Sequence, residues 1–151
     1  MKIVSACLAG ENCRWNGGNR LNKKIKKLVE KGEAVTACPE ILGGLTIPRE
    51  PTGIHRGLGD DVWDGKAWVR TTKKGEDQSE HYKKGALKFL DIAKSRNIDT
   101  AVLANKSPSC GCGKTWQLDD KFENHLVDGN GILASLLIRN GIKVYTEDDF
   151  K

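Results

Sequence analysis

The chain has 151 residues, of which 38% are hydrophobic and 30% charged, and its formal net charge is +5. No stretch approaches the ~20 consecutive apolar residues that cross a membrane, and the composition excludes disordered and fibrous classes. The 25 basic and 20 acidic residues predict a mixed surface, which permits a nucleic-acid partner but does not indicate one. We therefore expect a single domain, residues 1–151, that is cytoplasmic and monomeric and has no membrane or nucleic-acid partner.

The first half of the chain alternates strand-like and helix-like patterns. A short apolar run over residues 2–7 predicts a strand, and residues 19–32 carry apolar side chains at helical spacing and end at a glycine. Residues 33–38 predict a second strand. The Pro- and Gly-rich stretch that follows predicts a long loop, and such loops in compact domains are usually functional. Residues 60–70 predict a small β-hairpin, because a central Asp-Gly dipeptide separates two apolar groups.

The second half continues the same alternation. Residues 79–97 predict an amphipathic helix, 99–104 a third strand, 131–141 a last helix and 142–146 a last strand. Strands that alternate with helices favour a parallel sheet covered on both faces. The predicted fold is therefore α/β: a single Rossmann-like domain with a mainly parallel sheet, helices on both faces and a small β-hairpin insertion.

Three of the five cysteines fall at corresponding positions of the predicted strands. Cys7 ends the first strand, Cys38 ends the second, and Cys110 lies in the loop just beyond the third. The carboxyl ends of parallel strands share one edge of a sheet, which is where open α/β sheets bind ligands. Neighbouring strands lie about 4.8 Å apart, so thiols at this edge can surround one inorganic centre.

Other interpretations of these cysteines stay open. Free cysteine is among the most frequently buried residue types, so each thiol taken alone can belong to the core. Zinc usually binds four ligands, often as Cys-x-x-Cys pairs, which this sequence does not contain. Three scattered thiolates fit better with an iron-sulfur cluster that keeps one iron open. Cys13 and Cys112 lie close in sequence to the proposed ligands, and we expect that neither of them ligates.

Residues 103–115 end in Gly-Lys-Thr, which is also the ending of a phosphate-binding loop. Such a loop requires a glycine at the position of Pro108, and proline fixes φ and removes an amide donor. It also requires an apolar helix after the lysine, where this chain is polar and mixed. We therefore prefer the thiol interpretation of this segment.

Five stretches resemble the thiouracil desulfidases, a family long described as a domain of unknown function. These stretches are VSACLAGENCRWNGG (4–18), CPEILGGLTIPREP (38–51), DVWDGKAWV (61–69), SPSCGCG (107–113) and NGIKVYTE (140–147). The similarity runs along nearly the whole chain. It implies a 4Fe-4S cluster held by only three cysteines, and the matching positions are Cys7, Cys38 and Cys110.

The resemblance also implies a reaction: the non-redox removal of sulfur from a thiolated pyrimidine nucleobase, 2-thiouracil to uracil plus sulfide, at the open iron. It implies that Glu40 is the acid/base group and that Ser107 assists by hydrogen bonding. Taken alone, Glu40 can form a surface ion pair and Ser107 can serve a turn. Two alternatives stay open, a non-catalytic electron-transfer module with a fully ligated cluster and a zinc-binding structural protein.

Overall fold

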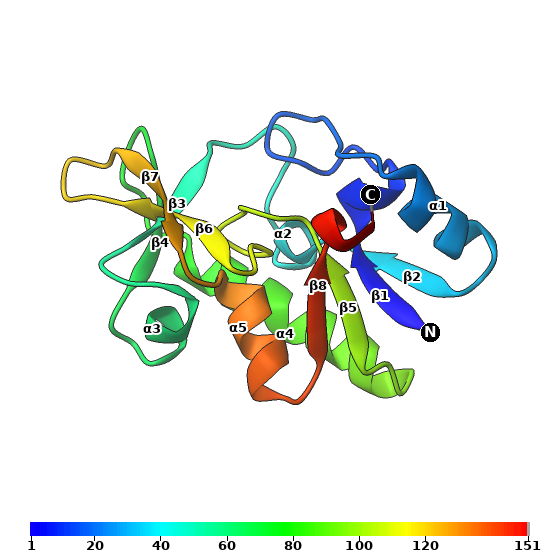
Figure 1. The fold of residues 1–151 in the computed structure, drawn as a ribbon. Helices are drawn as coiled ribbons and strands as arrows, with labels where there is room; N and C mark the ends of the chain where they lie inside the picture. The colour runs from blue at the N-terminus through cyan, green and yellow to red at the C-terminus, as the bar shows by residue number, and fades with distance from the viewer. Residues whose placement is uncertain (151) are drawn as a thin grey trace.

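The computed structural model describes residues 1–150, which form two four-stranded sheets (Figure 1). The strands are β1 (Lys2–Ser5), β2 (Ala34–Ala37), β3 (Thr52–His55), β4 (Trp68–Thr71), β5 (Thr100–Leu103), β6 (Lys114–Leu118), β7 (Asn124–Asp128) and β8 (Lys143–Thr146). The α-helices are α1 (Lys23–Glu30), α2 (Pro39–Leu42), α3 (Gly59–Trp63), α4 (Ser79–Ser95) and α5 (Ile132–Arg139), and the 3-10 helices are η1 (Ala6–Ala9) and η2 (Glu147–Phe150). Within the described residues, no helix combines the length and the apolarity that a membrane span requires.

The first sheet has the strand order β2-β1-β5-β8, and all of its strand pairs are parallel. Its strands are short apolar runs, and Ile3 and Val4 of β1 are fully buried. The chain moves from β1 to β2 in one direction and then to β5 and β8 in the other. Right-handed crossovers therefore place α1 on one face and α4 with α5 on the other. The predicted parallel sheet with helices on both faces is confirmed.

The helices differ in how much of their surface they bury. Helix α1 buries only Ile25 and exposes a row of lysines, as an amphipathic surface helix does. Helix α5 is buried over most of its length and packs against both α4 and α3. Helix α4 buries the predicted apolar stripe, which consists of Tyr82, Ala86, Phe89, Leu90 and Ala93. One hydrophobic cluster joins these helices to Ile54 and Val69 of the second sheet.

The second sheet, with the order β4-β3-β6-β7, was not predicted. Strand β3 pairs in antiparallel fashion with β4 and in parallel with β6, and β6 and β7 form an antiparallel hairpin. This sheet lies beside the parallel sheet, with α2 between the two (Figure 1). Its strands are short and mix polar with apolar residues, so they show little periodicity. The long loop predicted after residue 38 consequently contains both α2 and β3.

The predicted hairpin over residues 60–70 is wrong. Residues Gly59–Trp63 form α3, and the carboxylate of Asp61 caps its first turn by accepting a hydrogen bond from the Leu58 amide at 2.9 Å. Asp64 ends this helix, and β4 pairs with β3 instead of with the residues before it. Carboxylates in the first turn favour a helix, and this preference outweighs the Asp-Gly turn signal.

Two glycines allow the short helix α2 to lie directly against α4. A Cβ atom at Gly43, which follows α2, would clash with the carbonyl oxygen of His81. A Cβ atom at Gly85 of α4 would clash with the carbonyl oxygen of Pro39, at the start of α2. Backbone thus packs on backbone at this crossing, which fixes the start of α2 relative to the long helix.

We expect Gly85→Ala to lower the free energy of unfolding by about 3 kcal/mol, because the new methyl group pushes α2 away from α4. Chemical denaturation measures this loss. Leu87→Ala changes a side chain of the same helix that is 47% exposed, and it should alter stability by only about 0.5 kcal/mol. Equal stability of the Gly85→Ala variant and the parent would contradict the close approach of the two helices.

Candidate functional site

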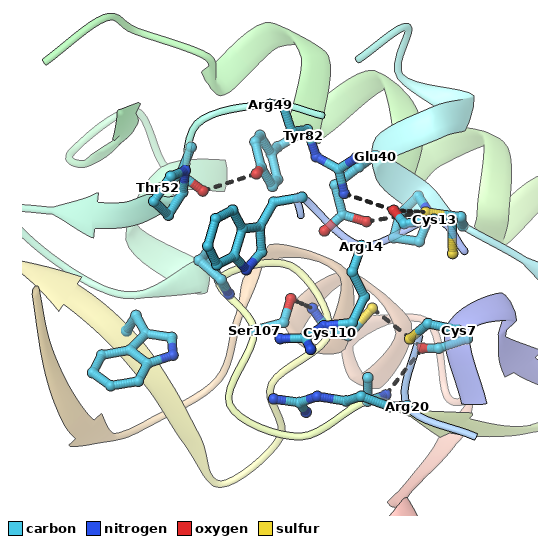
Figure 2. Close-up of a pocket in the computed structure, with 18 of the residues that line it drawn as sticks. Cys7, Cys13, Arg14, Arg20, Glu40, Arg49, Thr52, Tyr82, Ser107 and Cys110 are labelled. Carbon is cyan, nitrogen blue, oxygen red and sulfur yellow. Dashed lines mark hydrogen bonds between the residues drawn. The ribbon is translucent and has the colours of Figure 1, made fainter. Parts of the chain in front are cut away.

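A cavity of about 400 Å³ lies where the carboxyl edge of the parallel sheet meets the second sheet. One part of its lining follows β1, β2 and β5, and the other part comes from β3, β6 and β7. The structure brings all the residues predicted for the site into this lining: Cys7, Cys38, Glu40, Ser107 and Cys110. Figure 2 shows Cys7, Cys110 and Glu40 around the same cavity although they come from distant parts of the chain.

Cys7 and Cys38 occupy similar positions after neighbouring strands. Strands β1 and β2 are paired so that Ser5 lies opposite Ala37, and Cys7 and Cys38 follow shortly after this pair. Cys7 lies in η1, and its carbonyl accepts a hydrogen bond from the Arg20 amide at 2.9 Å. Cys38 is the N-cap residue of α2. The ends of β1 and β2 therefore lie side by side, as predicted.

Cys110 reaches the same edge through the loop that follows β5. The Ser5 hydroxyl donates a hydrogen bond to Cys110 Sγ at 3.3 Å and accepts one from the Ala104 amide at 3.0 Å. This buried hydroxyl links β1 to both ends of the loop. The Cys110 thiol is consequently held beside the end of β1, close to Cys7 (Figure 2).

Ser107 shapes the loop that carries Cys110. Its Oγ accepts hydrogen bonds from the amides of Ser109 and Cys110, each at 3.0 Å. We expect Ser107→Ala to lower the free energy of unfolding by about 1–2 kcal/mol, because two partly buried amides lose their acceptor. Thermal unfolding measures the loss. Ser107→Thr retains the hydroxyl and should keep most of the stability, so an equal loss in both variants would rule out this explanation.

Burial disfavours the ionised form of two of the site thiols, Cys38 and Cys110. Cys110 is only 4% exposed, and burial, followed by the charge of Glu40, raises its pKa well above the ordinary value. The pKa of Cys38 is also raised, first by the contact with the Cys13 thiol and then by burial and by Glu40. Thiolates are the form that binds metal, so loading a metal here must release protons.

Glu40 lies in the first turn of α2 and contacts the thiol that precedes this helix. The Cys38 thiol donates a hydrogen bond to Glu40 Oε2, with 3.4 Å between the two atoms. Glu40 also lines the cavity, so the same carboxylate faces both the thiols and the open space. A carboxylate in this position can exchange a proton with a molecule that enters the cavity.

Cys13 and Cys112 occupy different environments. Within residues 1–150, the cavity lining includes Cys13 but not Cys112. The contact with Cys38 lowers the pKa of Cys13, whereas the contact with Cys7 and burial raise it. Together these effects raise the pKa of Cys13 to about 12. Burial and the charge of Asp149 raise the pKa of Cys112. The site thus contains a fourth thiol, and that thiol is Cys13.

The spacing of the thiols suits a polynuclear centre better than a single ion. Zinc holds sulfur ligands at about 2.3 Å, so its thiolates lie roughly 4 Å apart. Among residues 1–150, no three cysteine Sγ atoms lie within 4.8 Å of one another. Among the described residues, one group of potential metal ligands has this compact spacing, and it consists of Asp119, Glu123 and His125. These residues lie on the β6–β7 hairpin, where Asp119 accepts a hydrogen bond from the Glu123 amide and contacts the His125 ring. Soft sulfur donors that do not form such a compact group fit an iron-sulfur cluster.

The segment 103–115 does not form a phosphate-binding loop. The residues after Gly113 form β6 rather than a helix, and Lys114 Nζ pairs with Asp128 of β7 at 2.7 Å. The buried Thr115 hydroxyl donates to the Ser107 carbonyl at 2.9 Å. Thr115 therefore supports the loop that carries Cys110, whereas Lys114 pairs within the β6–β7 hairpin.

Several residues of the cavity were not predicted. Trp15, two residues after Cys13, lines the cavity. The residues that sequence reasoning missed are Arg20, Arg49, Glu50, Thr52, Tyr82, Trp116 and Asn124. Most of them belong to the second sheet or to the segment that leads into it. Because these strands were not predicted from the sequence, the positions of these side chains could not be predicted either.

Comparisons with known proteins identify the family of this chain. A family model described as 2-thiouracil desulfurase matches residues 3–149. Uncharacterized protein YbbK of Bacillus subtilis (strain 168) is 43% identical over 149 residues, which cover 99% of this chain and 97% of the relative. The solved structure of the 4Fe-4S-dependent thiouracil desulfidase TudS matches with a TM-score of 0.82 and 34% identity, covering 97% of this chain and 90% of that one. The chain therefore belongs to the 2-thiouracil desulfurase family.

Proposed function

We propose that this protein converts 2-thiouracil to uracil and sulfide, using a 4Fe-4S cluster held by Cys7, Cys38 and Cys110. The observation that carries this proposal is the meeting of three thiols, from three separate segments, in a cavity large enough for a nucleobase. The family and the likeness to TudS support the same chemistry.

The overall reaction exchanges the sulfur of a C=S group for the oxygen of water and releases hydrogen sulfide, so no electrons are gained or lost. When bound, the cluster supplies an iron with a free position that attracts sulfur. The three thiolates hold this cofactor at the carboxyl edge of the parallel sheet. Neighbouring side chains carry out the proton transfers that this reaction requires.

Glu40 is the proposed acid/base group. Its carboxylate takes a proton from water as the new C–O bond forms, and it returns a proton to sulfur as the C–S bond breaks. Its contact with Cys38, at 3.4 Å, supports a place beside the reacting sulfur. Ser107 Oγ already accepts two amide hydrogen bonds, so its own O–H remains to donate into the cavity, where it can orient the water or the substrate.

A second candidate function follows from Cys13, which lines the same cavity and contacts the thiols of Cys38 and Cys7. As a fourth ligand it would close the cluster, and a closed cluster transfers electrons without binding a substrate. Replacing Cys13 with serine separates the two functions. An enzyme with three ligands keeps its iron in this variant, whereas a module with four ligands loses iron or gains an open position.

Anaerobic reconstitution with iron and sulfide, followed by addition of 2-thiouracil, tests the proposal. A brown protein that releases sulfide and uracil in equal amounts supports the desulfidase. A brown protein that is inert, and that loses cluster in the Cys13→Ser variant, supports electron transfer. A colourless protein that binds zinc instead of iron contradicts both.

A further inference from the structure

Glu50 is a carboxylate in the cavity wall that has no partner in the structure. Its Oε2 atom is shut off from solvent and accepts no hydrogen bond within residues 1–150. Among the same residues, no ion pair includes Glu50. A carboxylate oxygen removed from water without a donor is costly and correspondingly rare in folded proteins. Such an acceptor in a cavity wall is available to a donor on a bound ligand.

Two of the three arginines that line the cavity donate to acceptors other than Glu50, and the third, Arg14, forms no ion pair within residues 1–150. Arg49, the preceding residue, donates to the carbonyls of Thr46 and Cys13 at 3.2 and 3.0 Å. Arg20, across the cavity, donates to the Asn105 carbonyl and side chain at 2.7 and 2.8 Å. These cations therefore hold the loops of the site and leave the Glu50 carboxylate unmatched.

The segment that carries Glu50 is held firmly on both sides. The Arg49 amide donates to the Trp15 carbonyl at 2.8 Å, and the hydroxyls of Thr52 and Tyr82 share a hydrogen bond of 2.8 Å. Figure 2 shows Arg49, Thr52 and Tyr82 on the side of the cavity that faces Ser107 and Cys110. The backbone on either side of Glu50 is thus held by hydrogen bonds, and Glu50 itself lines the cavity, as a preorganised recognition group requires.

The chemistry of the substrate supplies the missing donor. In 2-thiouracil the C=S carbon lies between two ring nitrogens, and each of them carries a hydrogen. A carboxylate accepts from such an N–H group and repels the exocyclic oxygen and sulfur atoms. Trp15 and Trp116 line the same cavity and offer aromatic faces for the flat ring.

We propose that Glu50 accepts a hydrogen bond from a ring N–H next to the thiocarbonyl and so determines which edge of the pyrimidine faces the thiols. This inference rests on the proposed function. It assigns to Glu50 a role in substrate binding and orientation, separate from the proton transfers of Glu40.

The test combines variants at Glu50 with N-methylated substrates, using anaerobic, cluster-loaded protein. Glu50→Ala should raise KM for 2-thiouracil about 10- to 100-fold, the range for a hydrogen bond to a charged group, and leave kcat within a few-fold. The near-isosteric Glu50→Gln variant should show a smaller rise. Glu33→Ala removes the same charge at an exposed position outside the cavity lining and should leave KM unchanged.

The N-methyl isomers identify the hydrogen bond itself. Of the two isomers 1-methyl- and 3-methyl-2-thiouracil, one should bind the parent protein much more weakly than the other. Glu50→Ala should remove this difference, because the substitution removes the acceptor and makes room for the methyl group. Equilibrium dialysis measures binding independently of turnover. Iron content and circular dichroism establish that each variant is folded and loaded.

Two results would overturn the assignment of Glu50: a Glu50→Ala variant that binds 2-thiouracil as well as the parent, or isomer discrimination that persists in that variant. A different result addresses the proposed function. If the parent binds 2-thiouracil with the expected discrimination but releases no sulfide, the desulfidase proposal fails while the recognition role of Glu50 stands.

Discussion

Replacing Cys110 with serine is expected to abolish both cluster binding and sulfur release. A serine hydroxyl does not ionise in this buried position, so only two of the three proposed ligands remain. Loss of the Lewis-acidic iron should slow desulfuration on the order of a thousand-fold or more, equivalent to several kcal/mol of transition-state stabilisation. Iron and acid-labile sulfide per chain, together with the rate of sulfide release, measure the two effects.

Cys112→Ser provides the matched control, because it makes the same chemical change two residues away in the same loop. Cys112 lies outside the cavity lining, so this variant should retain iron, colour and activity. Similar unfolding temperatures of the two variants would show that the loss in Cys110→Ser is not caused by misfolding. A Cys110→Ser variant with full iron content would remove Cys110 from the ligand set.

Glu40→Gln is expected to keep the cluster and lose the proton transfer. Glutamine has nearly the same shape but accepts no proton, so kcat should fall about 10²- to 10⁴-fold, the usual contribution of a general acid/base group. In the cluster-free protein the hydrogen bond from the Cys38 thiol to the side-chain oxygen can persist, because an amide oxygen is also an acceptor. Steady-state kinetics with 2-thiouracil and iron analysis separate the two properties.

Glu80→Gln serves as the reference for this experiment. Glu80 lies on the surface of α4, where it pairs with Lys83 at 2.8 Å, and its neutralisation should leave kcat unchanged. An undiminished kcat in Glu40→Gln would assign proton transfer to another group. Loss of iron in that variant would assign to Glu40 a structural role beside Cys38.

The thiol side of the cavity could be predicted from the sequence because apolar runs define the strands of a parallel sheet. Residues around Val4, Val35 and Val102 form such runs, and each is followed by a segment that carries a cysteine. Parallel strands place these segments at a common edge, whatever the details of the loops. The direction of Cys13 into the same space depends on the loop after η1, which has no periodic pattern.

The other side of the cavity could not be predicted because its strands lack a clear pattern. Strand β7 reads NHLVD and is mostly exposed, so it resembles a loop. In residues 60–70, Asp64 and Gly65 suggested a hairpin turn, whereas the helix cap formed by Asp61 decides the local structure. Glu50 lies between two prolines in the segment taken as a loop, and only tertiary contacts reveal where its carboxylate points.

The presence of two sheets has an evolutionary consequence. Strand β7 is an edge strand that pairs only with β6, and this hairpin contributes Trp116 and Asn124 to the cavity but no thiol. Substitutions or changes of loop length in this hairpin can alter which thiolated compounds bind in the cavity. They leave the cysteines, and therefore the assembly of the cofactor, unchanged. Descendants of one ancestral scaffold can in this way acquire new specificities by drift in a single exposed ribbon.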